Sequence, residues 1–290
     1  MIRYVAYAFF VLILAVFAYP VGYYVASPAQ SIAFQNSQAS YAGIGAYVIN
    51  LDRSKDRLDF VLPRIQQLGI PVERVPGVDG SLLSEEELNA HVDMEAYKSY
   101  MNHYPKKGMV GCCLSHIKTW RAFLDSGYAF ALIFEDDVQF DPAQLKKVVN
   151  QLMAIPELWD LNSFEISHKG TPLTLKELAD GQVLVTYTTE ITHAGCYLLN
   201  RRAAQKLLEK AFPINLPIDH YFARPWEFGL RFTGVENPRI VHQNFGNSVI
   251  GASVRYSENP TTVKGSIYMA IFKVQSYAIR FVYGWKTYFL

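Results

Sequence analysis

The chain has 290 residues, half of them hydrophobic, which is enough to bury one large core or two modest ones and excludes disorder along its whole length. Lys and Arg total 27 against 26 for Asp and Glu, so no overall charge favours nucleic acid or a strongly acidic partner. The cysteines, Cys112, Cys113 and Cys196, are odd in number and lack C-x-x-C spacing, which excludes a disulfide framework and fits buried thiols or a reducing compartment.

The first residues predict a membrane anchor. Residues 4–26 carry no charge and are long enough to cross the roughly 30 Å hydrocarbon layer as a helix. Tyrosines stand toward both ends of this run, as an interfacial aromatic belt requires. A cleaved signal peptide is the alternative, because Arg3 precedes the run and small residues follow it, although the apolar region of such peptides is usually about 7 to 15 residues. We therefore expect one transmembrane helix within residues 1–26.

Residues 27–45 are uncharged, small and polar, which is the composition of a flexible linker, so we expect the folded domain to occupy residues 46–255. The apolar run at 46–51 predicts a buried strand, and apolar residues at helical spacing up to Gly69 predict a helix after it. Residues 72–78 predict a second strand. The order strand, helix, strand is typical of an α/β domain with parallel strands.

The next elements lead to a group of acids. Ser84 and Glu87 form a capping-box pattern, and a helix is expected at about 111–125. The apolar run at 130–134 predicts a buried strand that ends at three carboxylates: Glu135, Asp136 and Asp137. Ligands of open α/β sheets bind beyond the carboxyl ends of the strands, so these acids lie where a ligand is expected.

Two interpretations of the three acids remain open from the residues alone. They can be a solvated turn, with Asp141 capping a helix that begins at Pro142. They can instead surround a divalent cation, which relieves the repulsion between neighbouring carboxylates and presents a positive charge to a diphosphate.

Five segments in order resemble glycosyltransferase family 25, the group that contains bacterial lipooligosaccharide galactosyltransferases and collagen galactosyltransferases. They run from about residue 46 to about residue 248 and read AYVINLDRSKDR, GCCLSH with Trp120, LIFEDDV, HAGCYLLNRRAAQKLL and PIDHYF. The resemblance implies one α/β domain of the GT-A type, which binds a nucleotide-sugar donor.

The resemblance also implies that Mn²⁺ or Mg²⁺ lies on the donor diphosphate, held by an Asp-x-Asp-like motif. Here EDDV supplies that motif without a strict D-x-D, with Asp137 as the foremost expected ligand, Glu135 as a second and Asp136 on the donor side. His242 stands where such folds place a late ligand; the alternative is an ordinary core or surface histidine.

The same resemblance implies a donor pocket built from two segments. The first follows the opening strand and the second lies on the expected helix at 111–125; the residues are Asn50, Asp52, Arg53, Arg57, Gly111, Ser115 and His116. Arg57 can instead be a surface cation balanced by Asp52 or Asp56. Ser115 and His116 do not predict a nucleophile and its base, because adjacent residues on a helix do not face each other. Trp120, Cys112 and Cys113 are expected to pack in the core.

The acceptor side is expected in the second half of the chain, after a strand at 159–167, two strands from 183 and a helix at 201–210. His193 and Gly195 are candidate sugar contacts, because glycine permits close approach of backbone to a ligand; a simple turn is the alternative. Asp219 is the candidate base that takes the proton of the acceptor hydroxyl, with Glu227 and Glu190 as further candidates. Asp219 can instead cap one helix over HYFARPWEF.

These assignments predict a metal-dependent, inverting transfer of a hexose, with galactose expected, from a UDP-sugar to a saccharide acceptor such as the lipooligosaccharide or lipopolysaccharide core. Two other classes stay open: a catalytically silent relative that acts as a binding or adhesion module, and a metal-dependent nucleotide-sugar hydrolase.

The last segment, residues 256–290, mixes aromatic residues with Lys273, Arg280 and Lys286 and has no acid after Glu258. This composition is typical of a segment lying on an anionic membrane; a helix packed on the domain is the alternative. Together with the anchor it would bring the site near a lipid-linked acceptor. We expect the cytoplasmic face of a bacterial inner membrane, where nucleotide sugars are found, although Arg3 favours the opposite orientation.

Overall fold

The computed structural model describes residues 43–168, 170–244 and 263–289. The predicted anchor and all but the last three residues of the predicted linker lie outside these ranges. None of the helices within them has the length and apolar character that a membrane crossing needs.

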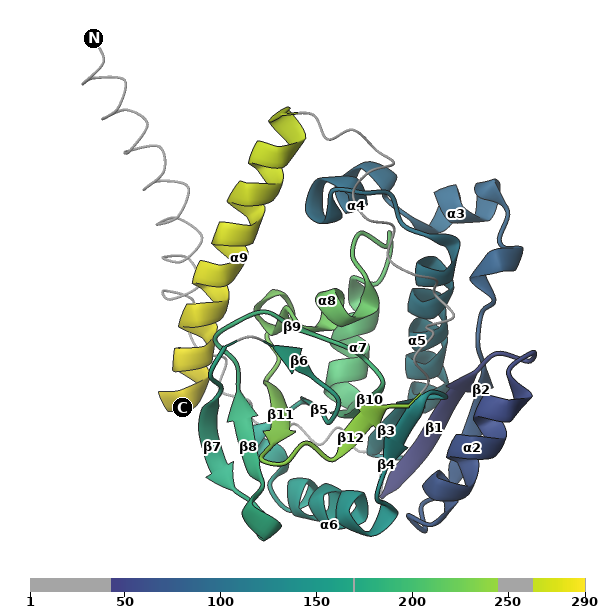
Figure 1. The fold of residues 1–290 in the computed structure, drawn as a ribbon, viewed down its shortest axis with the longest axis vertical. Coiled ribbons are helices and arrows are strands. Elements are labelled where there is room, and N and C mark those ends of the chain that lie inside the picture. Colours follow the sequence, from purple (N-terminus) through teal and green to yellow (C-terminus); the bar gives the residue numbers. More distant parts are fainter. Residues whose placement is uncertain (1–42, 169, 245–262, 290) are drawn as a thin grey trace.

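An eight-stranded mixed sheet forms the centre of the protein (Figure 1). Its strands lie in the order β2 (Val72–Pro76), β1 (Ile44–Asn50), β3 (Phe130–Glu135), β10 (Cys196–Asn200), β5 (Leu161–Ser163), β11 (Phe232–Glu236), β8 (Val183–Thr186) and β7 (Leu173–Glu177). As predicted, β1 pairs in parallel with β2, and it also pairs in parallel with β3. Beyond β3 most pairs are antiparallel, so the expectation of parallel strands holds for the first part of the sheet.

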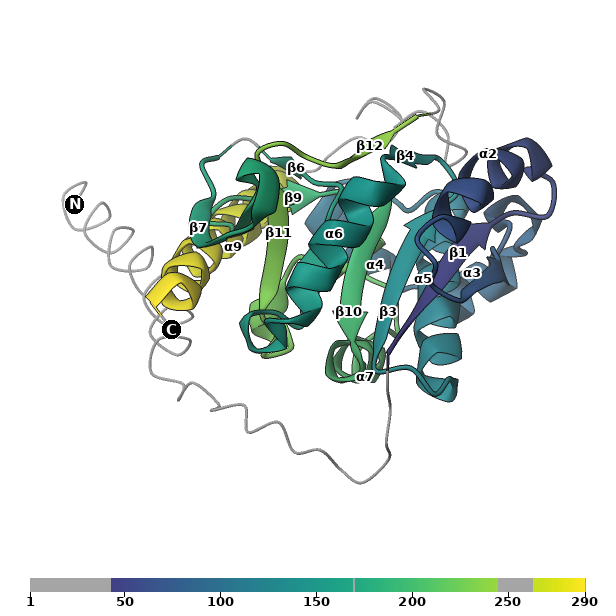
Figure 2. The same cartoon turned by 90° about the horizontal axis from the view of Figure 1, so that it is seen from below.

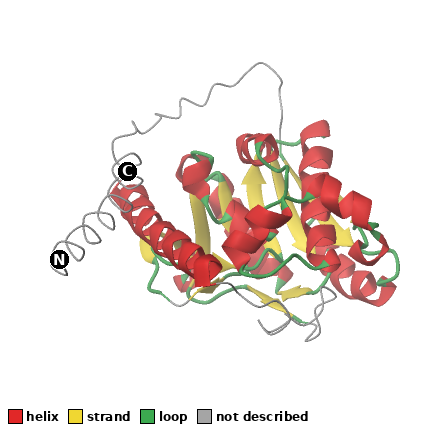
Figure 3. Cartoon of the chain, turned by 90° about the horizontal axis from the view of Figure 1, so that it is seen from above, coloured by secondary structure: helices red, strands yellow, loops and turns green. Residues whose placement is uncertain are grey.

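Helices cover both faces of this sheet (Figures 2 and 3). Alternate residues of β3 enter two separate cores, as the period of two along a strand requires: Leu132 and Phe134 face one, and Ala131 and Ile133 the other. The first core is closed by α2 (Lys55–Gln66) and α6 (Pro142–Met153), and the second by α5 (Lys107–Asp125) and α7 (Arg201–Glu209). β3 is therefore buried on both sides, and the acids that follow it are held rigidly.

Two predicted helix caps are confirmed. Ser84 and Glu87 form a reciprocal capping box at the start of α3 (Glu85–His91), and a second short helix, α4 (Met94–Met101), follows. Asp141 accepts a hydrogen bond from the Gln144 backbone and begins α6, while β4 (Val138–Phe140) separates it from the three acids. Asp141, rather than the acids, therefore has the capping function.

The strand expected at 159–167 is wrong in its extent, because β5 ends at Ser163. The Ser163 hydroxyl donates to the Glu165 backbone carbonyl over 3.0 Å, and the chain then enters β6 (Ser167–His168), which pairs with β9 (Ile191–Thr192) in a separate small sheet. The two strands expected from residue 183 are three for the same reason: β8, β9 and β10. Apolar alternation continues across such a change of sheet and does not reveal it.

The single helix expected over HYFARPWEF is also wrong. The chain forms α8 (Ile218–Phe222) and then a separate 3₁₀ turn at Pro225–Glu227, because a residue before proline disfavours the helical conformation. The last helix, α9 (Val263–Phe289), lies against α4, β7 and β8 (Figure 1). The Tyr283 hydroxyl on α9 accepts a hydrogen bond from the Phe232 backbone over 2.8 Å, so one face of this helix is packed on the domain.

Candidate active site

The three acids line a cleft of about 420 Å³ between the ends of β1 and β3 and the first turns of α5. Glu135 is the last residue of β3, and Asp136 and Asp137 form the turn into β4. Several residues predicted from the sequence share this cleft: Asn50, Arg53, Arg57, Ser115 and His116. The parallel pairing of β1 with β3 brings these two parts of the chain together.

Asp136 is held by two groups from the first β-α unit. Asn50 Nδ2 donates to Asp136 Oδ2 over 2.7 Å, and Arg57 Nη1 lies 3.3 Å from Asp136 Oδ1. Burial raises the pKa of Asp136, and the bonds from Asn50 and Arg57 oppose that shift. Arg57 is therefore not the surface cation of the alternative interpretation, because its side chain is only 11% exposed and pairs with Asp136 and Asp137.

The negative charge of Asp137 is balanced by weaker contacts than that of Asp136. Arg57 Nη1 lies 3.5 Å from Asp137 Oδ2, and Gln243 on β12 (Val241–Gln243) donates to the same oxygen over 3.2 Å. Burial first, and then the charge of Glu135, raise the pKa of Asp137 to about 7. The site thus holds more negative charge than its own cations balance, which is the condition that a bound divalent cation would relieve.

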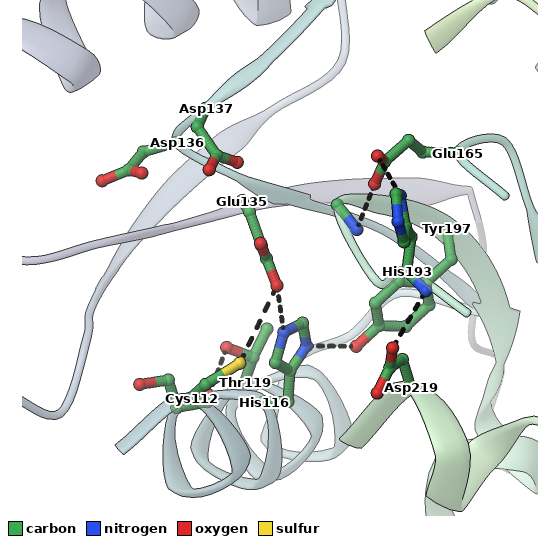
Figure 4. Close-up of polar contacts among 12 residues, drawn as sticks. Cys112, His116, Thr119, Glu135, Asp136, Asp137, Glu165, His193, Tyr197 and Asp219 are labelled. Atoms are coloured by element: carbon green, nitrogen blue, oxygen red, sulfur yellow. Dashed lines mark hydrogen bonds and ion pairs between the residues drawn. The ribbon is translucent and has the colours of Figure 1, made fainter. Parts of the chain in front are cut away.

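Glu135 stands at the end of a buried hydrogen-bonded chain that links α5 to β10 (Figure 4). His116 Nε2 lies 3.0 Å from Glu135 Oε1, and His116 Nδ1 lies 2.8 Å from the Tyr197 hydroxyl, to which Trp120 Nε1 donates over 2.9 Å. Tryptophan only donates and an ionised carboxylate only accepts, so a neutral His116 carries its proton on Nε2 and the Tyr197 hydroxyl donates to Nδ1. Trp120 is thus a core residue, as predicted, and also the start of this chain.

The donor atoms at the cleft fit a hard cation such as Mg²⁺ or Mn²⁺, because they are carboxylate oxygens. Glu135 and Asp137 are the acids best placed for it, since Asp136 is already bound by Asn50 and Arg57. Among the described residues, Cys112, His116 and Glu135 are the one group of three possible ligand atoms that lie close enough together to share an ion. Burial, however, keeps the pKa of the Cys112 thiol well above its usual range, and a metal ligand must be the thiolate. Both His116 nitrogens also have partners, so we interpret this cluster as hydrogen-bonded support for Glu135.

His242 has no hydrogen bond or ion pair with the acids, whereas its neighbour Gln243 contacts Asp137 within the part of the chain that the structure describes. His242 lies on β12 opposite Gln139. Successive side chains on a strand point to opposite faces, so the strand turns His242 away from the face that Gln243 uses. Its assignment as a metal ligand stays a prediction.

Glycines and Ser115 fix the first turns of α5 against the 3₁₀ turn at Gly80–Leu82. A Cβ on Gly111 would lie 2.6 Å from the Val78 carbonyl oxygen, so only glycine fits there. Ser115 accepts a hydrogen bond from the Val78 backbone over 2.8 Å and donates to the Gly111 carbonyl over 2.7 Å. Ser115 and His116 have separate partners, which agrees with the exclusion of a nucleophile pair. Gly111 shapes the wall rather than lining the cleft.

Asp52 and Arg53 differ in their placement. Asp52 is 82% exposed and pairs with Arg74 over 2.5 Å, outside the residues that line the cleft. Arg53 lines the cleft and forms an ion pair with Asp79, which caps the 3₁₀ turn. Of the two, only Arg53 can reach a ligand in the cleft.

A second polar group lies across the β9–β10 connection (Figure 4). His193 Nδ1 lies 2.7 Å from Glu165 Oε1, and the Gly195 backbone donates to Glu165 Oε2 over 3.0 Å. A Cβ on Gly195 would come within 2.3 Å of that oxygen, so this glycine makes room for a carboxylate. The predicted close approach at Gly195 is thus made by Glu165 within the protein.

Asp219 faces the same connection. Its Oδ2 accepts from the His193 backbone over 3.0 Å, and its Oδ1 accepts from the His220 backbone over 2.9 Å. Asp219 lies in the first turn of α8, but the cap position is Pro217 and no described side chain caps this helix, so the capping alternative for Asp219 is wrong. Both of its oxygens are therefore engaged by backbone donors.

The two further candidate bases lie in other surroundings. Glu190 pairs with His220 over 3.4 Å and accepts from the Tyr277 hydroxyl over 3.1 Å; the bond with His220 lowers the pKa of Glu190 to about 2. Glu227 pairs with Arg224 three residues before it. A carboxylate as acidic as that of Glu190 is a poor proton acceptor, and the Glu227 carboxylate is already paired with Arg224.

Sequence reasoning missed Glu165 and Tyr197. Glu165 stood within a run that reads as one strand, where a charged residue looks like an outward-facing position. Tyr197 stood in the apolar run of β10, where its ring looks like a core residue. Glu165 contacts His193, and Tyr197 contacts His116. Both contacts depend on the pairing of segments that are distant in the chain, and a single sequence does not reveal such pairing.

Comparisons with known proteins agree with these features. The sequence profile of glycosyltransferase family 25, described as an LPS biosynthesis protein, matches residues 44–222, more than half of the chain. A glycosyltransferase 25 family member from Aedes aegypti is 30% identical over 188 residues, 60% of this chain and 30% of that protein. Human procollagen galactosyltransferase 2 is 29% identical over 184 residues, 60% of this chain and 29% of that protein. Human inactive glycosyltransferase 25 family member 3 is 34% identical over 121 residues, 40% of this chain and 20% of that protein. The chain thus spans less than a third of the length of these relatives.

Proposed function

Because the chain belongs to glycosyltransferase family 25, we propose that it transfers a hexose from a nucleoside diphosphate sugar to a saccharide acceptor. UDP-galactose is the donor that we propose, since relatives are named procollagen galactosyltransferases. The saccharide of a lipooligosaccharide or lipopolysaccharide core is the proposed acceptor, in line with the description of the family. The domain, which we assign to the GT-A type, would bind the donor in the cleft beyond β1 and β3.

The observation that carries this proposal is the buried carboxylate of Asp137, whose pKa is raised by burial and by the neighbouring Glu135, in the lining of a cleft of about 420 Å³. A divalent cation, Mn²⁺ or Mg²⁺, would offset the negative charge of the departing diphosphate. Glu135 and Asp137 would hold it, and Arg57 and Asn50 would keep Asp136 in place beside them. Lys107 and Arg53 at the other rim of the cleft add positive charge for phosphate oxygens.

The reaction that fits these parts is a single inverting displacement. The acceptor hydroxyl loses its proton to a base, its oxygen bonds to the anomeric carbon, and the bond from that carbon to the diphosphate breaks. An α-linked donor would give a β-linked product. No covalent intermediate on the protein is needed.

The test is incubation of the purified chain with a set of UDP-sugars and Mn²⁺, with and without a core oligosaccharide, read by mass spectrometry. We expect a hexose to be added to the acceptor with release of UDP. Asp137→Asn should lose both product and metal-dependent UDP binding in calorimetry, whereas Asp125→Asn, an exposed acid at the end of α5, should keep both. Unchanged UDP affinity of Asp137→Asn in Mn²⁺ would refute the metal assignment.

The other two classes give different results in the same experiment. An inactive relative, as one human family member is named, would bind UDP but release none with any acceptor. A hydrolase would release free sugar at a rate that does not depend on the acceptor. The intact group of three acids favours the transferase over the inactive form.

We also propose that the outer face of α9 lies on an anionic membrane surface. Apolar residues recur on it at steps of three and four, and each is at least one-third exposed: Ile267, Ile271, Val274, Tyr277, Phe281, Trp285 and Tyr288. Lys273 and Lys286 flank this stripe, and the helix has no acid. An exposed apolar stripe with basic flanks and no acid fits anionic headgroups above a hydrocarbon layer. Together with the predicted anchor in residues 1–26, it would hold the site near a lipid-linked acceptor on the cytoplasmic face of a bacterial inner membrane.

A further inference from the structure

The contact between His193 and Glu165 has the geometry of a catalytic imidazole and its orienting carboxylate. Glu165 is buried, and its two oxygens are divided between His193 Nδ1 at 2.7 Å and the Gly195 backbone at 3.0 Å. This arrangement fixes the direction of the imidazole and places its proton on Nδ1 when the ring is neutral. Nε2 is then the basic atom.

The imidazole is open to a ligand. The His193 side chain is 43% exposed, and within the part of the chain that the structure describes its Nε2 has no hydrogen bond. A histidine that is buried for structural reasons usually has partners on both nitrogens, as His116 does. His193 therefore combines a fixed ring with an unoccupied basic nitrogen.

The backbone at His193 is strained. Its φ is +83°, in the left-handed region that residues other than glycine seldom adopt. The bond from the His193 backbone to Asp219 Oδ2 and the bond from its side chain to Glu165 hold this conformation from two sides. Such strain persists where the surroundings enforce it, and it is concentrated at functional sites.

The two oxygens of Asp219 are already engaged within the protein. The His193 backbone donates to Oδ2 and the His220 backbone donates to Oδ1, so neither oxygen is as open to the acceptor hydroxyl as His193 Nε2. Its contact with the His193 backbone gives it a different use, which is to hold His193 in the left-handed conformation.

We propose that His193, oriented by Glu165, is the base that deprotonates the acceptor hydroxyl, and that Asp219 is a positioning residue for it. This inference rests on the proposed function. In the transfer step the acceptor O–H proton moves to His193 Nε2, the freed oxygen forms the bond to the anomeric carbon, and the diphosphate leaves with the electron pair of the broken bond. The positive charge on the imidazole is stabilised by Glu165.

The charges around His193 agree with this use. The hydrogen bond with Glu165 raises its pKa most, burial opposes the rise, and the charges of Glu165, Asp219 and Glu135 add to it. A base whose pKa lies near the working pH transfers protons most effectively.

The decisive variant is His193→Gly, because glycine accepts a φ of +83° and leaves space for free imidazole. We expect kcat to fall about 10²- to 10⁴-fold, with unchanged binding of UDP and Mn²⁺ in calorimetry, and added imidazole to restore turnover in proportion to its concentration. Asn102→Gly is the matched control, since Asn102 has φ +64° at the end of α4, and it should keep full activity.

Two further variants separate the carboxylates. Glu165→Gln should move the rising limb of the pH profile of kcat/KM to lower pH, because the imidazole loses the group that raises its pKa. Asp219→Asn retains one oxygen acceptor and should lose less than about tenfold in kcat, whereas a base at that position would lose about 10²- to 10⁴-fold.

The outcomes distinguish this inference from the proposed function. A His193→Gly variant with full turnover, or with a loss that imidazole does not restore while UDP binding is intact, overturns the role of His193. A large loss in Asp219→Asn together with a mild one in His193→Gly assigns the base to Asp219. Absence of transfer by the unaltered chain with every donor and acceptor overturns the proposed function, and the base role with it.

Discussion

Asn50 and Asp136 join the ends of two strands through their side chains. The backbone pairing of β1 with β3 extends to Ile49 and Glu135, and one residue further Asn50 Nδ2 donates to Asp136 Oδ2 over 2.7 Å. Asn50 Oδ1 in turn accepts from Arg74 Nε on β2 over 3.0 Å. One buried amide therefore links β1, β2 and the residue that follows β3 beside the acid cluster.

Replacing this amide by a carboxylate should destabilise the metal-free protein. Asn50→Asp loses the donor to Asp136 and places a fourth acid in the group, so we expect a loss of about 1–3 kcal/mol in the free energy of unfolding. Urea denaturation in a chelating buffer measures it. Asn150→Asp on the exposed face of α6 is the matched control and should change little. Equal stability of the two variants would show that the hydrogen bond from Asn50 to Asp136 does not stabilise the protein.

The stability of the metal-free protein should depend on pH through Asp137. Its pKa is about 7 in the folded protein and near 3.8 without these surroundings, so the folded state binds this proton more tightly. The resulting stabilisation is complete below about pH 4 and is lost as the pH rises to about 7. Asn does not ionise, so Asp137→Asn does not lose stability in this way as the pH rises. Between about pH 4 and pH 7 its free energy of unfolding should therefore come to exceed that of the unaltered chain, by a few kcal/mol at most.

Denaturation at a series of pH values between 4 and 8, with and without Mn²⁺, tests this dependence. Mn²⁺ should reverse the loss in the unaltered chain near pH 7 and leave Asp137→Asn unaffected, because only the ionised carboxylate binds a cation. Asp125→Asn should follow the unaltered chain. Parallel curves for Asp137→Asn and the unaltered chain would contradict the raised pKa.

The hydrogen bonds from Trp120 to Tyr197 and from Tyr197 to His116 predict that two buried tyrosines differ in their effect on stability. Tyr197→Phe removes the acceptor of Trp120 Nε1 and the donor to His116 Nδ1, and should lower the free energy of unfolding by about 1–3 kcal/mol. Tyr97 is equally buried, but its hydroxyl has no hydrogen-bond partner among the described residues. Tyr97→Phe should therefore leave stability unchanged or raise it. Thermal unfolding of both variants measures this difference. Equal losses of stability would contradict the role of the buried hydrogen bonds of Tyr197.

Contact of α9 with lipid should be visible through Trp285, which is 37% exposed on its outer face. Brominated anionic lipids in vesicles should quench the tryptophan fluorescence of the full chain, and Trp285→Phe should remove most of this quenching. Trp226→Phe, on the side that packs against Tyr283, should retain it. Quenching that survives the loss of Trp285 would place the lipid contact elsewhere, and vesicles of neutral lipid should show less quenching in every case.

Local patterns sufficed for the elements that surround the donor cleft. The apolar runs of β1 and β3, the capping box of α3 and the Asp141–Pro142 start of α6 are each determined within a few residues, so the sequence predicts them. Because two parallel neighbouring strands end at the same edge, the meeting of Asn50 and Arg57 with the acids also follows from the sequence.

The acceptor side depends on pairings that the sequence does not display. The chain leaves the main sheet after Ser163 to form β6 and again after Thr186 to form β9. The pairing of β6 with β9 in the small sheet brings Glu165 to His193. Asp219 was predicted from its segment, but its engagement by the His193 backbone depends on the tertiary position of α8. The sequence therefore does not reveal the roles of residues whose contacts join different sheets or helices, such as Glu165 and Asp219.

The central claim is that Glu135 and Asp137 hold a divalent cation against the diphosphate of the donor. Anomalous diffraction from a crystal containing UDP and Mn²⁺ tests it most directly. We predict one manganese peak beside the carboxylates of Glu135 and Asp137 and next to the bound diphosphate, with the uridine in the cleft beside β1. A nucleotide bound elsewhere, or manganese bound only by Cys112 and His116, would contradict the claim.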